Sequence, residues 1–165
     1  MELKLNTGKA FAKLQGKYKF HISKDTALIA IKDGSHGTIS IRELAHILFG
    51  GTNTIPPRPA FADYIDDVLA TKQDWLYAQF KAHTSIRKAK STSPNYLADI
   101  YIDLDTDGLG NVVLLDLQRW IASGNYYRSH VPNAPSTIRK KGHDIPLVDK
   151  GILLNSLFSQ TKKGT

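Results

Sequence analysis

The feature that most constrains this chain is the helical spacing of its apolar residues after a proline-rich stretch. Steps of three and four residues place one set of side chains on a single helix face: Phe61, Tyr64, Ile65, Val68, Leu69, Trp75, Leu76 and Phe80. Pro59 suits the first turn, where the backbone N–H that proline lacks would have no partner. The pattern therefore predicts one long central helix, from about Ala60 to the high 80s.

The residues before this helix predict a small antiparallel sheet. A short helix is expected over 9–14, followed by two strands. Apolar and polar residues alternate over 18–22, and 27–31 is a continuous apolar run. Both patterns are typical of strands, and the polar residues between and after them favour a hairpin.

A second helix is expected directly after these strands. Ser40 and Glu43 have the spacing of a capping box, in which each side chain accepts a hydrogen bond from the other residue's backbone N–H. This spacing predicts a helix that begins at Ile41. The pair Gly50-Gly51 supplies the left-handed backbone that commonly ends a helix.

Apolar spacing predicts four more helical segments in the second half of the chain. They cover 97–104, 111–124, 136–141 and 149–158. Asn111 is expected to cap the second of them, after a polar loop in which Gly108 and Gly110 form the turn. Asp149 is expected to cap the last one by accepting hydrogen bonds from the N–H groups of Gly151 and Ile152.

These elements predict a single α+β domain over 1–165, with a small antiparallel N-terminal sheet packed against four to five helices. The length of 165 residues and the 41% hydrophobic content suffice for one buried core. The basic tail is expected to fray from about residue 160. No apolar run approaches the ~18 residues that cross a bilayer, so no membrane partner is expected.

Motifs for catalysis and cofactor binding are not found in the sequence. Because the chain has no cysteine, it has no disulfide framework, thiolate nucleophile or cysteine-bound metal. No Gly-x-Ser-x-Gly turn, phosphate loop or helical histidine pair occurs. We therefore expect a protein that is not an enzyme and that holds no cofactor.

One acidic segment resembles part of a calcium loop. Asp103, Asp105 and Asp107, followed by Gly108, match the first half of an EF-hand. The twelfth position, where a bidentate glutamate belongs, is Leu114, so the segment has too few ligands for a hard cation. It is a weak metal candidate, and the alternative is an acidic loop between two helices.

The charges are segregated along the chain. The net charge is +6 over residues 1–90, −5 over 91–118 and +6 over 119–165. Such blocks favour association with other subunits or with nucleic acid. The basic cluster Arg139, Lys140 and Lys141 is a candidate surface for DNA or for an acidic partner. Sequence-independent nucleic-acid binding is therefore the alternative function.

Two segments use glycine and proline in ways that local structure alone does not require. They are ELAHILFGGTNTIPPRPAF, residues 43–61, and PNAPSTIRKKGHDIPLVDKGILLNSL, residues 132–157. Together they resemble the virion-morphogenesis proteins of tailed bacteriophages, a family of neck, head-tail joining and tail-completion proteins. The positions that carry the resemblance are Phe49, Gly50, Ile55, Pro56, Arg58, Pro59, Phe61, Pro146, Leu147, Asp149 and Gly151.

The chain departs from the family pattern at three positions. Gly51 replaces the usual threonine, Ala60 intervenes before Phe61, and Lys150 replaces a second threonine. The resemblance implies a structural protein at the head-tail junction, assembled in the host cytoplasm and carried in the virion. It also implies a ring of identical copies, neighbours among portal, neck or tail proteins, and a possible contact with packaged DNA. Arg58 is expected to hold carbonyls or a carboxylate through its planar guanidinium.

Overall fold

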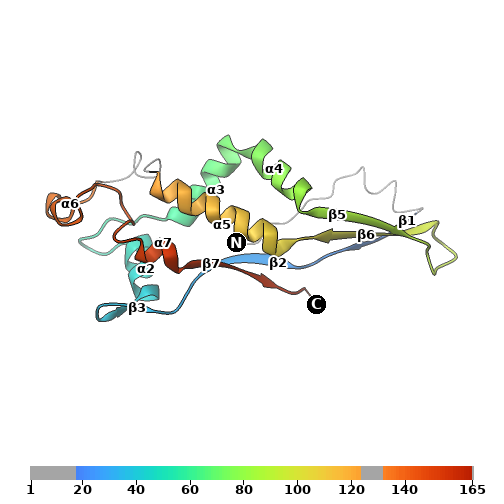
Figure 1. Ribbon diagram of the computed structural model, residues 1–165, viewed down its shortest axis with the longest axis horizontal. Coiled ribbons are helices and arrows are strands. Elements are labelled where there is room, and N and C mark those ends of the chain that lie inside the picture. The colour runs from blue at the N-terminus through green and yellow to red at the C-terminus, as the bar shows by residue number, and fades with distance from the viewer. Residues whose placement is uncertain (1–17, 124–131, 165) are drawn as a thin grey trace.

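The computed structural model describes residues 18–123 and 132–164 and has a mixed α+β fold (Figure 1). The elements are β1 (Tyr18–Ile22), β2 (Thr26–Ile31), β3 (Ser35–His36), β4 (Ile39–Ser40), α2 (Ile41–Gly50), α3 (Ala60–Thr71), α4 (Gln73–Ala82), β5 (Thr84–Ala89), β6 (Ala98–Leu104), α5 (Thr106–Ala122), α6 (Pro135–Lys141), α7 (Ile152–Ser156) and β7 (Leu157–Lys162). The expected α+β class is confirmed. The helix expected over 9–14 lies outside the described residues.

The described strands form three separate sheets. Two of the pairings, β1 with β6 and β2 with β7, join strands that are distant in sequence. β1 pairs in parallel with β6, which pairs in antiparallel fashion with β5, giving the order β1-β6-β5. β2 pairs in antiparallel fashion with β7, with Ile31 opposite Leu157. The expected sheet formed by 18–22 and 27–31 is therefore wrong, because each strand pairs with a segment from later in the chain. Strands that are neighbours in sequence pair in antiparallel fashion at β3–β4 and at β5–β6.

The C-terminal residues complete the second sheet. β7 continues to Lys162, and the ammonium of Lys163 lies 2.6 Å from a carboxylate oxygen of Asp25. The backbone N–H of Gly164 donates to the other oxygen of Asp25 at 3.1 Å. The tail that we expected to fray is held as far as residue 164, because it pairs with β2 and its lysine finds a carboxylate.

The long helix expected from Ala60 is divided into two. α3 and α4 meet at a corner at Lys72, whose backbone leaves the helical region with φ −127°. The Lys72 ammonium lies 2.8 Å from a carboxylate oxygen of Asp116 on α5, and Tyr64 donates to the same oxygen at 2.9 Å. The corner thus coincides with a polar link to α5, and the chain continues as strand β5 after Ala82.

The segment expected as a helix over 97–104 is strand β6. The spacing of its apolar residues fits a helix and also fits a strand. The segment forms a strand because it pairs with β1 on one side and β5 on the other.

The longest described helix is α5, which begins earlier than expected. Asp105 caps it by accepting from the N–H of Gly108 at 2.9 Å, so Asn111 is not the cap. Gly110 lies within the helix, where an added Cβ would approach the Ser159 hydroxyl to 2.2 Å. This glycine is needed for close packing of α5 on the β2–β7 sheet rather than for a turn. Leu117 and Ile121 of α5 are 1% exposed and lie in the core.

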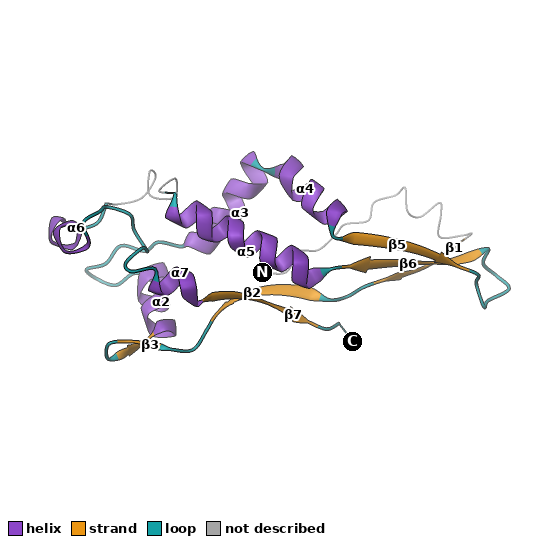
Figure 2. Cartoon of the chain, viewed as in Figure 1, coloured by secondary structure: helices purple, strands orange, loops and turns teal. Residues whose placement is uncertain are grey.

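The molecule has two parts, which we call the body and the arm (Figure 2). The body holds α2 to α7, the β2–β7 sheet and the core. The arm is the sheet β1-β6-β5 with the connection 90–97, and it extends away from the helices. The body positions the motif segments, and the arm carries much of the remaining exposed apolar surface.

Candidate functional site

The two motif segments, which are far apart in sequence, converge on one cavity in the body. This cavity has a volume of about 520 Å³, and we call it the motif cavity. Ile55, Pro56 and Arg58 line it from the connection between α2 and α3. Leu147 and Asp149 line it from the later segment.

The first segment has a sharply folded backbone at Gly51. Gly51 has φ +73°, and an added Cβ would lie 2.7 Å from both the Ile55 carbonyl oxygen and the Pro57 nitrogen. The N–H of Thr52 donates to the Ile55 carbonyl at 2.8 Å, and the N–H of Ile55 donates to the Thr52 hydroxyl at 3.1 Å. Glycine at position 51 is therefore required by the fold of this loop, and Thr52 holds the turn.

Arg58 is the buried charge at the centre of the site. Its exposure is 5%, and its backbone N–H donates to the carbonyls of Leu48 and Phe49 at the end of α2. Its guanidinium donates to the side-chain oxygen of Asn133 at 3.4 Å. The N–H of Asn133 in turn donates to Asp144 at 2.9 Å. A single arginine therefore links the end of α2 to the second motif segment.

Lys141 adds a second cation at the wall of the motif cavity. Its ammonium donates to the carbonyl of Ile145 at 2.7 Å. Burial lowers the pKa of Lys141, and the nearby charge of Arg58 lowers it further, whereas Asp149 and Asp144 oppose the shift. The two cations at this wall thus donate to oxygens of the protein itself, with Asp144 and Asp149 nearby.

The second motif segment is shaped by an unusual backbone. Pro146 is fully buried, and Leu147, Lys150 and Gly151 all have positive φ, at 61°, 51° and 69°. The N–H of Ile152 donates to the backbone carbonyl of Asp149 at 3.3 Å. The expected side-chain cap by Asp149 is wrong, because α7 begins after Gly151 without a side-chain cap. The Asp149 side chain is exposed at the rim instead.

The remaining motif residues join α2 to α3. The rings of Phe49 and Phe61 lie 5.0 Å apart at 56°, so the late position of Phe61 still brings the two aromatic rings together. Pro59 is the residue that precedes the first turn of α3. Gly50 has open space around its Cβ position and meets no close neighbour.

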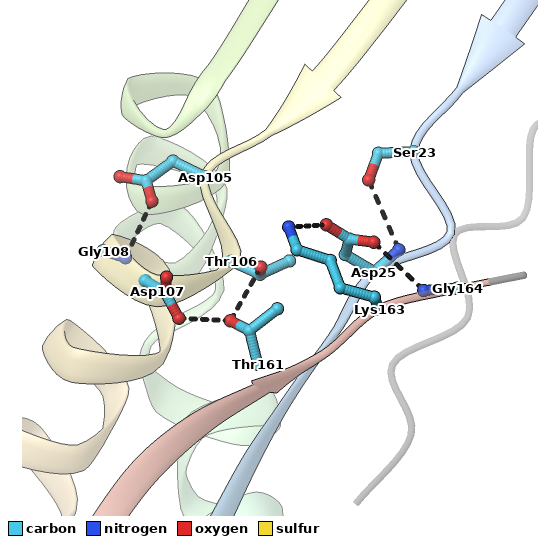
Figure 3. Close-up of polar contacts among 9 residues, drawn as sticks. All are labelled: Ser23, Asp25, Asp105, Thr106, Asp107, Gly108, Thr161, Lys163 and Gly164. Carbon is cyan, nitrogen blue, oxygen red and sulfur yellow. Dashed lines mark hydrogen bonds and ion pairs between the residues drawn. The ribbon is translucent and has the colours of Figure 1, made fainter.

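Two carboxylates of the weak metal candidate, those of Asp105 and Asp107, accept hydrogen bonds from the protein itself (Figure 3). Asp105 caps α5 and lies 3.1 Å from the His83 ring nitrogen. These two contacts lower the pKa of Asp105, the Gly108 hydrogen bond most strongly. Asp107 accepts from the Thr161 hydroxyl on β7, and Asp103 is exposed on β6. Among the described residues, no group of three acidic or histidine side chains is placed to hold a metal.

The basic cluster at the end of α6 is divided between two environments. Arg139 and Lys140 are exposed, whereas Lys141 is half-buried against the motif cavity. Only the first two are therefore available to a phosphate backbone or an acidic surface.

A row of one cation and two aromatic rings, which no sequence pattern predicted, crosses the arm. The Arg87 guanidinium lies 4.5 Å from the centre of the Tyr101 ring, and the His21 ring stacks on Tyr101 at 4.5 Å and 9°. The three residues come from β5, β6 and β1 and are directly opposite one another in the sheet. The helix expected over 97–104 does not bring these residues together. They are aligned only because this segment is strand β6 and pairs with β1 and β5.

The chain matches no protein-family model, no curated protein and no solved structure. Within residues 18–123 and 132–164, no helix combines the length and the apolar character that crossing a membrane requires.

Proposed function

We propose that this chain is a non-enzymatic structural protein of a tailed-bacteriophage virion. It acts at the head-tail junction, as a neck, tail-completion or tail-terminator subunit. It assembles in the host cytoplasm, forms a ring of identical copies, and contacts portal, neck or tail proteins. Its basic surface faces packaged DNA or an acidic neighbour.

The observation that supports this proposal best is the convergence of both motif segments on the motif cavity. Both segments contain glycines and prolines at positions where the local secondary structure does not require them. Arg58, nearly inaccessible to solvent, links one segment to Asn133 of the other at 3.4 Å. A shared contact of this kind is what two motifs with one structural role are expected to make.

The direct test is deletion of the gene from the phage or prophage that carries it. We expect DNA-filled heads and separate tails by electron microscopy, with infectivity restored when the gene is supplied in trans. Antibody against the chain should label wild-type particles where head and tail meet. Infectious, fully joined particles after deletion would contradict the proposal.

Sequence-independent nucleic-acid binding is the second candidate function. The row of Arg87, Tyr101 and His21 interleaves a cation with aromatic rings, and Lys19, two residues before His21 on β1, is exposed on the same face of the sheet. Such a surface suits phosphate contact and base stacking. Titration of a DNA duplex at low and high salt tests it: tight binding that weakens steeply with salt supports this function, and salt-independent or undetectable binding excludes it.

A further inference from the structure

One face of the arm carries a group of apolar side chains, two of which are at least half exposed among the described residues. In a sheet, residues directly opposite each other on paired strands share a face. The register therefore places Ile22, Ile102 and Ile86 in one row and Phe20 beside Ile100 in the next. Ile86 is 71% exposed and Ile22 is 50% exposed. We call these five residues the isoleucine face.

The isoleucine face continues the core outward beyond the body. Leu104, two residues after Ile102 and therefore on the same face of β6, packs against the core. Ile102 and Ile100, which precede Leu104, continue this face of β6 away from the body and are not among the described side chains that pack against the core. An apolar row that leaves the core and ends in solvent is typical of an interaction surface.

Two more exposed apolar side chains lie on α3 and α4. Leu69 is 49% exposed and Tyr77 is 72% exposed, on either side of the corner at Lys72. Asp66 and Asp74 each precede one of them by three residues, so each aspartate neighbours the apolar side chain on its own helix. We call these four residues the helix patch.

The two surfaces have opposite charge. α3 contains Asp63, Asp66 and Asp67 and no lysine or arginine. On the isoleucine face, Lys88 is exposed and lies opposite Ile100, whereas Arg87 lies opposite Tyr101 on the other face of the sheet. Apolar centres with complementary charge around them favour association of one surface with the other.

We propose that the isoleucine face of one copy packs against the helix patch of a second copy of this chain. Because the two surfaces differ and lie on separate parts of the molecule, the contact is heterologous and adds copies in one direction. Closure of this series into a ring rests on the proposed virion function. The contact itself rests on the exposed side chains and their charges.

Charge substitution at the centre of the isoleucine face is the first test. Ile86→Glu is compared with Leu115→Glu, a control on α5 whose side chain is 51% exposed and lies outside both surfaces. By size-exclusion chromatography with light scattering, we expect the wild type and Leu115→Glu to be oligomeric and Ile86→Glu to be monomeric, with similar melting temperatures. A monomeric wild type, or equal loss of the oligomer in both variants, would overturn the proposal.

Disulfide trapping then tests the direction of the contact. Because the chain has no cysteine, any cross-link must come from the introduced residues. Oxidation of the double variant Ile86→Cys/Tyr77→Cys should give a ladder of dimers, trimers and larger species, and either single variant should give none of the larger species. Efficient dimers from Ile86→Cys alone would show that two arms meet face to face and would overturn the proposed contact.

These outcomes are separable from failure of the proposed function. If deletion of the gene leaves heads and tails unjoined but the double variant forms no ladder, the virion role stands and the proposed interface is wrong. If the ladder forms but deletion leaves joined, infectious particles, the interface stands and the virion role is wrong.

Discussion

The body and the arm are built on different principles. In the body, packing buries side chains such as Leu117 and Arg58, each 5% exposed or less, and backbone hydrogen bonds from Thr52 and Arg58 fix the motif loop, residues 51–59. In the arm, backbone pairing holds three strands together while Ile86 is 71% exposed. Burial therefore determines the shape of the body, and hydrogen-bond pairing determines that of the arm. Substitutions in the body should change stability, and those on the open face of the arm should change association.

The largest expected contrast is between two apolar truncations. Leu117→Ala, in the core, should lower the free energy of unfolding by about 3 to 4 kcal/mol because it leaves a cavity. Ile86→Ala should change it by less than about 0.5 kcal/mol, since the side chain is already mostly in water. Urea denaturation of both variants at a concentration where the chain is monomeric measures the difference. Equal losses would mean that the arm is covered in the isolated chain.

The next effect concerns the motif loop. Gly51→Ala should cost about 3 kcal/mol, because alanine is strained at φ +73° and its Cβ would press on the Ile55 carbonyl. Gly50→Ala is the matched control, since nothing lies within 4 Å of its Cβ position and it ends helix α2. Thermal melting of both variants distinguishes them. A Gly51→Ala variant as stable as the control would show that the loop rearranges freely.

Local signals predicted the helix starts better than the strand partners. The capping box of Ser40 and Glu43 is present as predicted, with the Ser40 N–H donating to Glu43 at 3.0 Å and the Glu43 N–H donating to Ser40 at 3.1 Å. Such a box needs only residues three apart. Pairing of β1 with β6 joins Tyr18 to Ala98, and no local pattern in one sequence encodes such a distant partner. The expected N-terminal sheet failed for that reason.

The candidate site was predictable in its parts but not in its assembly. The positions of glycine and proline identified both motif segments in the sequence. That the two segments line one cavity could be seen only in the folded chain. Asn133 lies in the second motif segment but is not among the positions that carry the resemblance, yet its side chain is what Arg58 contacts. The glycines before Asn111 were interpreted as a turn, whereas Gly110 lies within α5 because β7 packs too closely for a side chain. Close approach of two elements is a tertiary property that spacing does not reveal.

A smaller effect is expected at the centre of the motif cavity. Arg58→Met should destabilise the body by about 2 kcal/mol, since it removes the hydrogen bond to Asn133 while keeping most of the side-chain volume. Removal of the neighbouring positive charge should also raise the pKa of Lys141. NMR titration of the Lys141 side chain measures that shift. Arg139→Met, on the exposed end of α6, is the control and should leave both quantities unchanged.

The smallest expected effect lies where the arm joins the body. Asp105 links the two, because its backbone N–H donates to the His83 carbonyl at 2.8 Å and its carboxylate caps α5 and contacts the His83 ring. Its pKa is lower in the folded protein than in the unfolded chain. The stability that it contributes is therefore present at neutral pH and is lost as the pH falls below about 4.

Two substitutions at this position separate the charge from the cap. Asp105→Asn keeps an acceptor for the Gly108 N–H but cannot ionise, so its melting temperature should fall less than that of the wild type on acidification. Asp105→Ala should lower the melting temperature at neutral pH as well, because it removes the cap.

Hydrogen exchange at Thr84 and Leu104, which are opposite each other where β5 and β6 leave the body, reports whether the arm loosens first. Faster exchange there in Asp105→Ala, with unchanged exchange at Leu117, is expected if the arm and body open separately. Equal acceleration at both places would show that they unfold as one unit.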